Sequence, residues 1–218
     1  MTKPTLPDLS QIQAAEQRIR PKLGETPLLT VPDLDATMGQ PLGLKCESFQ
    51  RTGSFKARGA LNWLLTASAD ELEAGLVTVS AGNHAIGLAW AAAMQDVPLT
   101  VVMPEGSSPL KIHRTRALGA EVIVHGNIQQ AVALCHQLRD DKGRTLVHPY
   151  NDVRIMAGQG TVGLELLRQQ SDVDRILCPI GGGGLISGLG LAIKAQRPEV
   201  ELIGVEPEGA ATMFNAWH

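Results

Sequence analysis

From residue 76 onward, short apolar runs alternate with longer segments of helical composition. The apolar runs predict strands over residues 76–79, 99–103, 121–124, 145–147, 175–180 and 201–206. The segments between them predict helices over residues 83–95, 108–118, 127–142, 151–169 and 184–197. Because strands that alternate with helices imply right-handed crossover connections, the pattern predicts an α/β fold with open, doubly wound, mostly parallel sheets.

The clearest helical period lies in residues 127–142, where apolar side chains recur at i, i+3, i+4 and i+7: Ile128, Ala131, Val132, Cys135 and Leu138. Nearer the start of the chain, the pattern predicts an amphipathic helix over residues 10–20, with Ser10 as its N-cap. The apolar face of that helix is formed by Ile12, Ala15 and Ile19. A strand over residues 42–47 and a helix over residues 55–66 complete the prediction.

Composition agrees with a globular α/β protein. Of the 218 residues, 44% are hydrophobic and 19% are charged, which supplies enough apolar material for one large domain or two small ones. Only 3% are aromatic, so Ala, Val, Leu and Ile must build the core. The 23 glycines exceed the usual share of about 7%.

Charge and cysteine content exclude several classes of function. The 19 basic and 22 acidic residues form no basic stripe, which argues against a nucleic-acid partner. Three cysteines without a C-x-x-C pair predict reduced core thiols, with no disulfide and no zinc site, in a cytoplasmic protein. Residues 1–10 lack the apolar run of an export signal. The uncharged stretch 176–193 contains Pro179 and six glycines, which argues against a membrane span.

Three loops that follow predicted strands could carry chemistry, because ligands of such folds bind beyond the carboxyl ends of the strands. The first loop consists of four consecutive glycines between a strand and a helix: Gly181, Gly182, Gly183 and Gly184. Backbone amides at a helix N-terminus bind anions, and glycines leave no side chain in the way. The alternative is a flexible turn, and the sequence favours a phosphate cradle.

The second loop has the sequence Ser-Ala-Gly-Asn-His over residues 80–84. Its exposed amides could hold a carboxylate, and Asn83 offers both a donor and an acceptor. Taken alone, Ser80 or Asn83 is better explained as a helix cap. The third segment, residues 50–59, runs into the start of the helix 55–66 and contains Lys56, where the positive helix end would favour a neutral, nucleophilic amine. An isolated lysine is usually only a solvated charge, and Arg58 is interpreted as structural.

Taken together, Ser-Phe-Lys-Ala-Arg-Gly at 54–59, Ser-Ala-Gly-Asn-His at 80–84 and Gly-Gly-Gly-Gly-Leu at 181–185 resemble fold-type II pyridoxal-phosphate (PLP) enzymes. The resemblance is closest to the threonine/serine dehydratase and serine racemase group, and it covers residues 20–208. It implies an ammonia-lyase that converts L-threonine or L-serine to a 2-oxo acid and ammonia. It also implies a homo-oligomer with PLP as cofactor.

The resemblance assigns roles to individual residues. Lys56 would bind PLP covalently and act as the catalytic base, Phe55 would pack against its ring, and Asn83 would hydrogen-bond the ring hydroxyl. The cofactor phosphate would be bound by Gly181, Gly182, Gly183, Gly184 and Leu185. The substrate carboxylate would be bound by Ser80, Ala81, Gly82, Asn83 and His84.

The resemblance also implies two domains. A large one would comprise residues 1–51 and 149–218 and bind the cofactor phosphate, and a small one, residues 52–148, would close over the substrate.

Several departures from the family pattern keep alternatives open. Serine racemases carry a serine base where this chain has Ala81, which favours dehydration over racemisation. Glu206 matches a ligand of the family's divalent-cation site, but Ala211 and Thr212 stand where acidic residues would be sought.

Family chains also continue well beyond residue 208, into strands and a side chain that faces the pyridine nitrogen. The alternatives are therefore a truncated or degenerate homologue that binds cofactor or a partner, or a racemase or β-replacement enzyme of the same fold.

Overall fold

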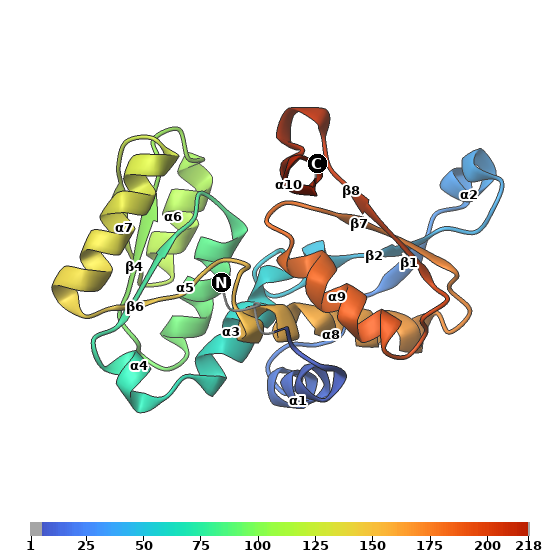
Figure 1. Ribbon diagram of the computed structural model, residues 1–218, viewed down its shortest axis with the longest axis horizontal. Helices are drawn as coiled ribbons and strands as arrows, with labels where there is room; N and C mark the ends of the chain where they lie inside the picture. Colours follow the sequence, from blue (N-terminus) through green and yellow to red (C-terminus); the bar gives the residue numbers. More distant parts are fainter. Residues whose placement is uncertain (1–5, 218) are drawn as a thin grey trace.

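A four-stranded parallel sheet lies at the centre of one half of the molecule in the computed structural model, which describes residues 6–217 (Figure 1). Its order is β5-β4-β3-β6, and its strands are β3 (Leu76–Val79), β4 (Leu99–Met103), β5 (Glu121–Val124) and β6 (Thr145–Leu146). The connecting helices are α5 (Asn83–Ala93), α6 (Pro109–Ala117) and α7 (Ile128–Lys142). Because the order reverses between β5 and β6, right-handed crossovers place α7 on the face opposite α5 and α6. This is the predicted doubly wound arrangement.

The other half contains two smaller sheets and three packed helices (Figure 1). β7 (Arg175–Pro179) and β8 (Glu201–Val205) are parallel, and α9 (Gly184–Lys194) connects them. β1 (Leu28–Thr30) and β2 (Gly43–Lys45) are antiparallel. α1 (Leu9–Ile19) and α9 both pack against α8 (Val153–Gln169).

α3 (Lys56–Thr66) joins the two halves, because it packs against both α5 and α8. The α3–α8 crossing is very close: a methyl group at Gly158 would lie 2.6 Å from the Cα of Gly59. α8 and α9 cross equally closely, because a methyl group at Gly188 would lie 2.1 Å from the carbonyl oxygen of Met156. Part of the glycine excess therefore serves close helix packing.

The predicted strands and helices from residue 76 onward are all present, with ends displaced by a few residues. The sequence did not predict β1, α4 (Ala69–Glu73), α2 (Pro32–Met38) or α10 (Thr212–Trp217), nor the single 3-10 turns Glu47–Phe49 and Glu208–Ala210. All are short, and short elements carry little periodic signal. Of the predicted strand 42–47, only β2 forms, because residue 47 begins the 3-10 turn Glu47–Phe49.

Two local predictions were wrong. Asp8, not Ser10, caps α1: its carboxylate accepts the Gln11 amide, and the Gln11 side chain accepts the Asp8 amide in return. In α7, Ala131 and Cys135 are buried as predicted, but Ile128 is 55% exposed. Ile128 begins the helix and lies beside a cavity described below.

The structure also bears on the cysteine thiols and on the predicted absence of a membrane span. Cys135 and Cys178 are buried, and burial raises the pKa of each to about 11, whereas Cys46 is half-buried. Across residues 6–217, no helix is long and apolar enough to cross a membrane. Residues 1–5, on which part of the export prediction rests, lie outside the described residues.

Candidate active site

Lys56 is the first residue of α3, as the sequence predicts, and its amine points across to the segment that precedes α8. The Nζ atom donates a hydrogen bond of 2.8 Å to the carbonyl oxygen of Pro149. Burial lowers the pKa of Lys56 from 10.5 to about 8. From the sequence, we expect the positive end of the helix to lower the pKa of Lys56. In the structure, desolvation of the buried amine lowers it. A sizeable fraction of this amine is therefore neutral near physiological pH.

The loop at residues 80–84 lies close to Lys56 because α5 packs tightly on α3. A methyl group at Gly87 of α5 would lie 3.1 Å from the backbone carbonyl carbon of Lys56. The Ser80 hydroxyl accepts the amides of Gly82 and Ala85, so it caps the first turn of α5. Asn83, the first residue of α5, is exposed, as is Ala81.

His84 is 2% exposed, and burial followed by the nearby charge of Lys56 lowers its pKa to about 3. Neither of its ring nitrogens makes a hydrogen bond of normal geometry among the described residues, although the backbone of Val147 lies near the ring and offsets part of the pKa shift. The hydroxyls of Thr52 and Ser54, just before Lys56 in the chain, are buried without a partner among the same residues. Buried polar atoms normally have partners, so these two hydroxyls point to polar groups of a ligand or of water that would complete the site.

The four-glycine loop connects β7 to α9 and adopts a conformation that only glycine accepts easily. Gly183 has φ +83°, and Gly184 begins the helix without any side-chain cap. Tyr150 packs directly on this loop, since a methyl group at Gly182 would lie 2.2 Å from its Cδ1 atom. The loop therefore keeps its backbone uncovered by side chains of its own, as an anion cradle requires.

Residues 148–150 contact two of the three segments, Lys56 and the glycine loop. The carbonyl of Pro149 holds Lys56, and the ring of Tyr150 covers the glycine loop. His148 accepts the Asn151 amide through Nδ1 at 2.9 Å and contacts Tyr150 edge to face. Burial lowers the pKa of His148, so its imidazole is neutral while Nδ1 accepts. No local pattern in the sequence marks residues 148–150 as a connection between distant loops.

Phe55 lies beside the lysine, with its ring centroid 5.3 Å from Lys56 Nζ. It packs against the same apolar cluster as Leu185, the last residue of the predicted phosphate loop. Phe55 and Leu185 therefore flank the site from two elements that are far apart in the sequence.

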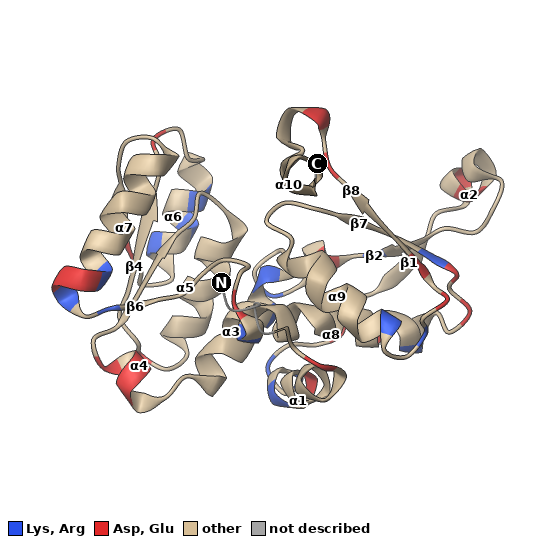
Figure 2. Ribbon diagram, in the orientation of Figure 1, with Lys and Arg blue, Asp and Glu red and all other residues tan. Residues whose placement is uncertain are grey.

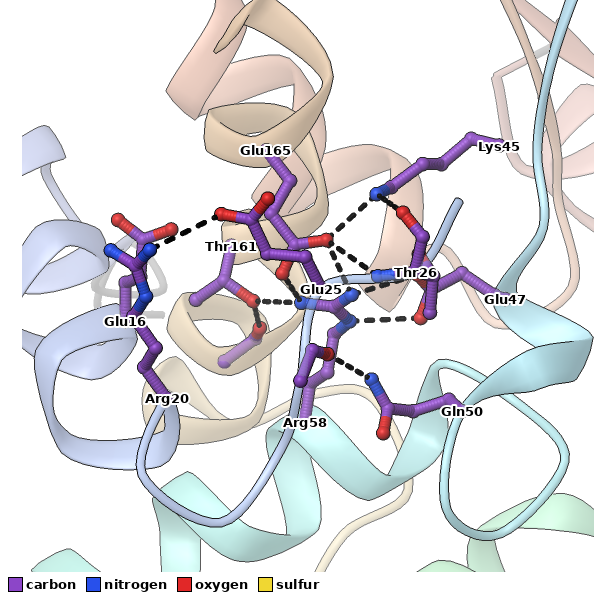
Figure 3. Close-up of polar contacts among 12 residues, drawn as sticks. Glu16, Arg20, Glu25, Thr26, Lys45, Glu47, Gln50, Arg58, Thr161 and Glu165 are labelled. Atoms are coloured by element: carbon purple, nitrogen blue, oxygen red, sulfur yellow. Dashed lines mark hydrogen bonds and ion pairs between the residues drawn. The ribbon is translucent and has the colours of Figure 1, made fainter. Parts of the chain in front are cut away.

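Directly behind Lys56, a buried ion network fixes α3 (Figure 3). The Arg58 guanidinium donates to Glu165 at 2.6 Å and to Glu47 at 2.8 Å, and Lys45 donates to Glu165 at 2.7 Å. The Arg58 side chain is 1% exposed, so burial disfavours its charge, but the two carboxylates outweigh that cost and raise its pKa. Arg58 is structural, as predicted; its carboxylate partners gave no signal in the sequence.

Lys111 was not predicted as a site residue. A methyl group at Gly82 would lie 3.3 Å from its Nζ atom, so its ammonium stands at the 80–84 loop. In Figure 2, the ribbon of α6, the helix that carries Lys111, is blue at its basic residues. Within residues 6–217, Lys111 makes no ion pair or side-chain hydrogen bond. Its position follows from the crossover after β4, which no local pattern encodes.

The structure gives Glu206 a different role from the predicted metal ligand. Its carboxylate accepts the amides of Met213 and Phe214 at 2.8 and 2.9 Å, which caps the first turn of α10. Among the residues that the structure describes, no group of three or more His, Cys, Asp or Glu could hold a metal ion. A divalent cation at Glu206 stays an untested prediction.

Comparison with known proteins decides the family. The profile of the family described as "Pyridoxal-phosphate dependent enzyme" matches residues 19–218. The chain belongs to this family. Its relatives are fold-type II PLP enzymes, and the fold agrees: the solved structure of maize serine racemase superposes with a TM-score of 0.91 at 37% identity, over 94% of this chain and 63% of that one.

Two curated relatives show the range of activities nearby. An L-threonine ammonia-lyase of Geobacter sulfurreducens is 46% identical over 91% of this chain and 50% of its own length. A phenylserine dehydratase of Ralstonia pickettii is 41% identical over 98% of this chain and 65% of its own length. The chain thus spans about half to two thirds of the lengths of these relatives.

The residues present fit PLP as the family's cofactor. A buried lysine of lowered pKa can react with an aldehyde, and a glycine loop without side chains of its own at a helix start can bind a phosphate. The buried hydroxyls of Thr52 and Ser54, close to that lysine in the chain, have no partner among the described residues and could bind further polar groups.

Proposed function

We propose that the protein is an ammonia-lyase that converts L-threonine or L-serine to a 2-oxo acid and ammonia. The observation that carries this proposal is the buried amine of Lys56, which the Pro149 carbonyl holds beside the 80–84 loop. When bound, PLP supplies an electron sink for negative charge at the substrate Cα. The name of the threonine ammonia-lyase relative supports the choice of reaction.

In this proposal, Lys56 would hold the cofactor through Nζ, and the same atom would take the proton from the substrate Cα. Its lowered pKa makes the neutral fraction of the amine much larger than that of a solvated lysine, and the neutral form is the one that acts as a base. Phe55 packs against the cofactor ring, and Asn83 binds the ring hydroxyl. The glycine loop, Gly181 to Gly184 with Leu185, binds the phosphate through backbone amides.

The substrate carboxylate is proposed to bind at the start of α5, in the loop Ser80, Ala81, Gly82, Asn83 and His84. Amides at a helix start favour an anion, and the ammonium of Lys111 adds a full positive charge there. Buried His84 stays neutral and can donate or accept one hydrogen bond. Ala81 has no group that moves a proton, which favours elimination over racemisation.

The proposal also retains a closing motion of residues 52–148 over the substrate and a homo-oligomeric state, both as predictions. It retains the alternative that the chain binds cofactor with little activity.

The decisive experiment combines turnover with chemical trapping. Lys56→Ala should lower the release of 2-oxo acid from serine or threonine by at least about 1,000-fold, because it removes both the covalent anchor and the base. Reduction with borohydride in the presence of PLP should attach a pyridoxyl group to Lys56, detected by peptide mass. Lys142→Ala, an exposed lysine on α7, is the control and should leave both results unchanged.

Two results would separate the alternatives. Retained turnover in Lys56→Ala would refute the assignment of Lys56. Trapping on Lys56 without any turnover of serine or threonine would favour the cofactor-binding homologue.

A further inference from the structure

A cavity of about 330 Å³ opens beside the candidate site, between the carboxyl ends of β3 and β6 and the first half of α7. Its apolar walls are formed by Val79, Leu146, Ile128, Val132 and Cys135, and its polar margin by Ser80, His136, His148 and Tyr150. It lies on top of the apolar cluster that packs α7 on the sheet. Apolar pockets with few polar groups are typical of small-molecule sites.

Three contacts join this cavity to the site. Pro149 lines it and also accepts the hydrogen bond from Lys56 Nζ. Ser80 lines it and also caps the loop proposed to bind the substrate carboxylate. Tyr150 lines it and packs on the glycine loop. A group that extends from a substrate held between these loops can therefore enter the cavity.

The cavity is larger than the side chains of serine and threonine require. A cavity of about 150 Å³ with aliphatic and aromatic walls is enough to hold benzene. A hydroxymethyl or hydroxyethyl side chain would leave most of the present volume empty. The apolar walls and the 55% exposed Ile128 at the rim would gain from contact with a larger apolar group.

We infer that this cavity is a side-chain subsite and that the protein accepts β-hydroxy amino acids with a bulky apolar group, such as an aryl ring, on Cβ. The inference rests on the proposed function and extends its substrate class. The reaction stays the same: the Cα–H and Cβ–OH bonds break, water leaves, and hydrolysis of the resulting enamine returns that water. The net products are an aryl-substituted 2-oxo acid and ammonia, so no oxidant or reductant is needed.

Binding can test the cavity without turnover. The probes are 3-phenyllactate and lactate, which share a carboxylate and a hydroxyl but differ by the aryl group on C3, and calorimetry measures both affinities. Because apolar contacts of this size are worth about 10- to 200-fold, we expect phenyllactate to bind at least about 10-fold more tightly. Val132→Phe, which fills the cavity, should abolish that preference.

The matched control is Ala133→Phe, which adds the same ring at the neighbouring, exposed position of α7. It should keep the preference for phenyllactate. Ile128→Phe at the rim is a second test variant that leaves the buried part of the helix unchanged. It should reduce the preference without affecting folding.

Turnover then separates this inference from the proposed function. The holoenzyme should release phenylpyruvate from threo-phenylserine, and Val132→Phe should lower the ratio of phenylserine to serine turnover by at least about 10-fold. Turnover of serine without any preference for phenyllactate would overturn the inference alone. A preference for phenyllactate that Val132→Phe abolishes, without turnover of any amino acid, would contradict the proposed function and leave the subsite standing.

Discussion

The two parallel sheets of this molecule bury their strands to different degrees. In the four-stranded sheet, Val101 and Val102 of β4 are fully buried, because helices cover both faces. In β7 of the pair β7–β8, alternate residues are exposed, with Leu177 at 58%, and β8 has no buried residue, with Val205 at 47%. This is the pattern of a sheet that is covered on one face only. Similar apolar runs thus produce a closed core in one region and an open apolar face in the other.

Ion pairs show the same contrast between closed and open surroundings. Arg58 and Glu165 join α3 to α8 behind Lys56, with side chains 1% and 5% exposed. Arg175 and Glu201 join β7 to β8 with the same 2.6 Å distance, but both side chains are more than half exposed. A buried charge depends on its partner, whereas water can replace the partner of an exposed one. We therefore expect the same substitution to have unequal effects at the two pairs.

The largest expected effect is loss of the buried carboxylate. Glu165→Gln would leave Arg58 and Lys45 without their shared anion, and we expect it to lower the free energy of unfolding by about 3–5 kcal/mol. Glu201→Gln at the exposed pair should change stability little. Urea unfolding of both variants measures the difference. Equal effects would show that burial does not set the strength of these pairs.

A smaller effect is expected at the helix crossings. Gly158→Ala places a methyl group 2.6 Å from the Cα of Gly59, so α3 and α8 must separate, at a cost of about 2–3 kcal/mol. The control Gly190→Ala in α9 meets only the flexible end of Leu202 and gains helix propensity. The midpoint temperature of thermal unfolding should be much lower for Gly158→Ala than for Gly190→Ala. The reverse order would refute the close α3–α8 crossing.

The smallest effect is expected from the same substitution, valine to threonine, made in each of the two sheets. Val101→Thr puts a hydroxyl into the closed core and should cost about 1–2 kcal/mol, because the group loses its hydration. The same change at Val205 adds a hydroxyl to a half-exposed position and should alter stability by less than about 0.5 kcal/mol. Denaturant midpoints of the two variants test this. A comparable loss at Val205 would mean that another part of the protein covers the β7–β8 face in solution.

Much of the fold was predictable because its signals are local. The alternation of strands and helices from residue 76 onward gave the fold class, and the structure confirms it. β1, α2 and α4 were missed, since three to seven residues hold too few periods to stand out. Exposure was misjudged at Ile128 because periodicity defines a helix face but not the cavity that lies against it.

The candidate site was predictable only in part. The lysine, the glycine loop and the 80–84 loop each follow a predicted strand or begin a predicted helix, so their sequence position pointed to ligand binding. The contacts of Pro149 with Lys56 and of Tyr150 with Gly182 were not predictable, since they join residues far apart in the chain. The same holds for Lys111, which reaches Gly82 from another helix.

The sequence by itself determined the elements, the α/β class and the chemical kinds of group present: a lysine at a helix start and a glycine loop after a strand. Only the tertiary structure decided which of these groups have a shifted pKa and which are held in one charge state by their neighbours. Burial lowered the pKa of Lys56 to about 8, and two carboxylates from other elements held Arg58 charged. Desolvation and long-range contact depend on packing between distant segments, and no local pattern of residues carries that information.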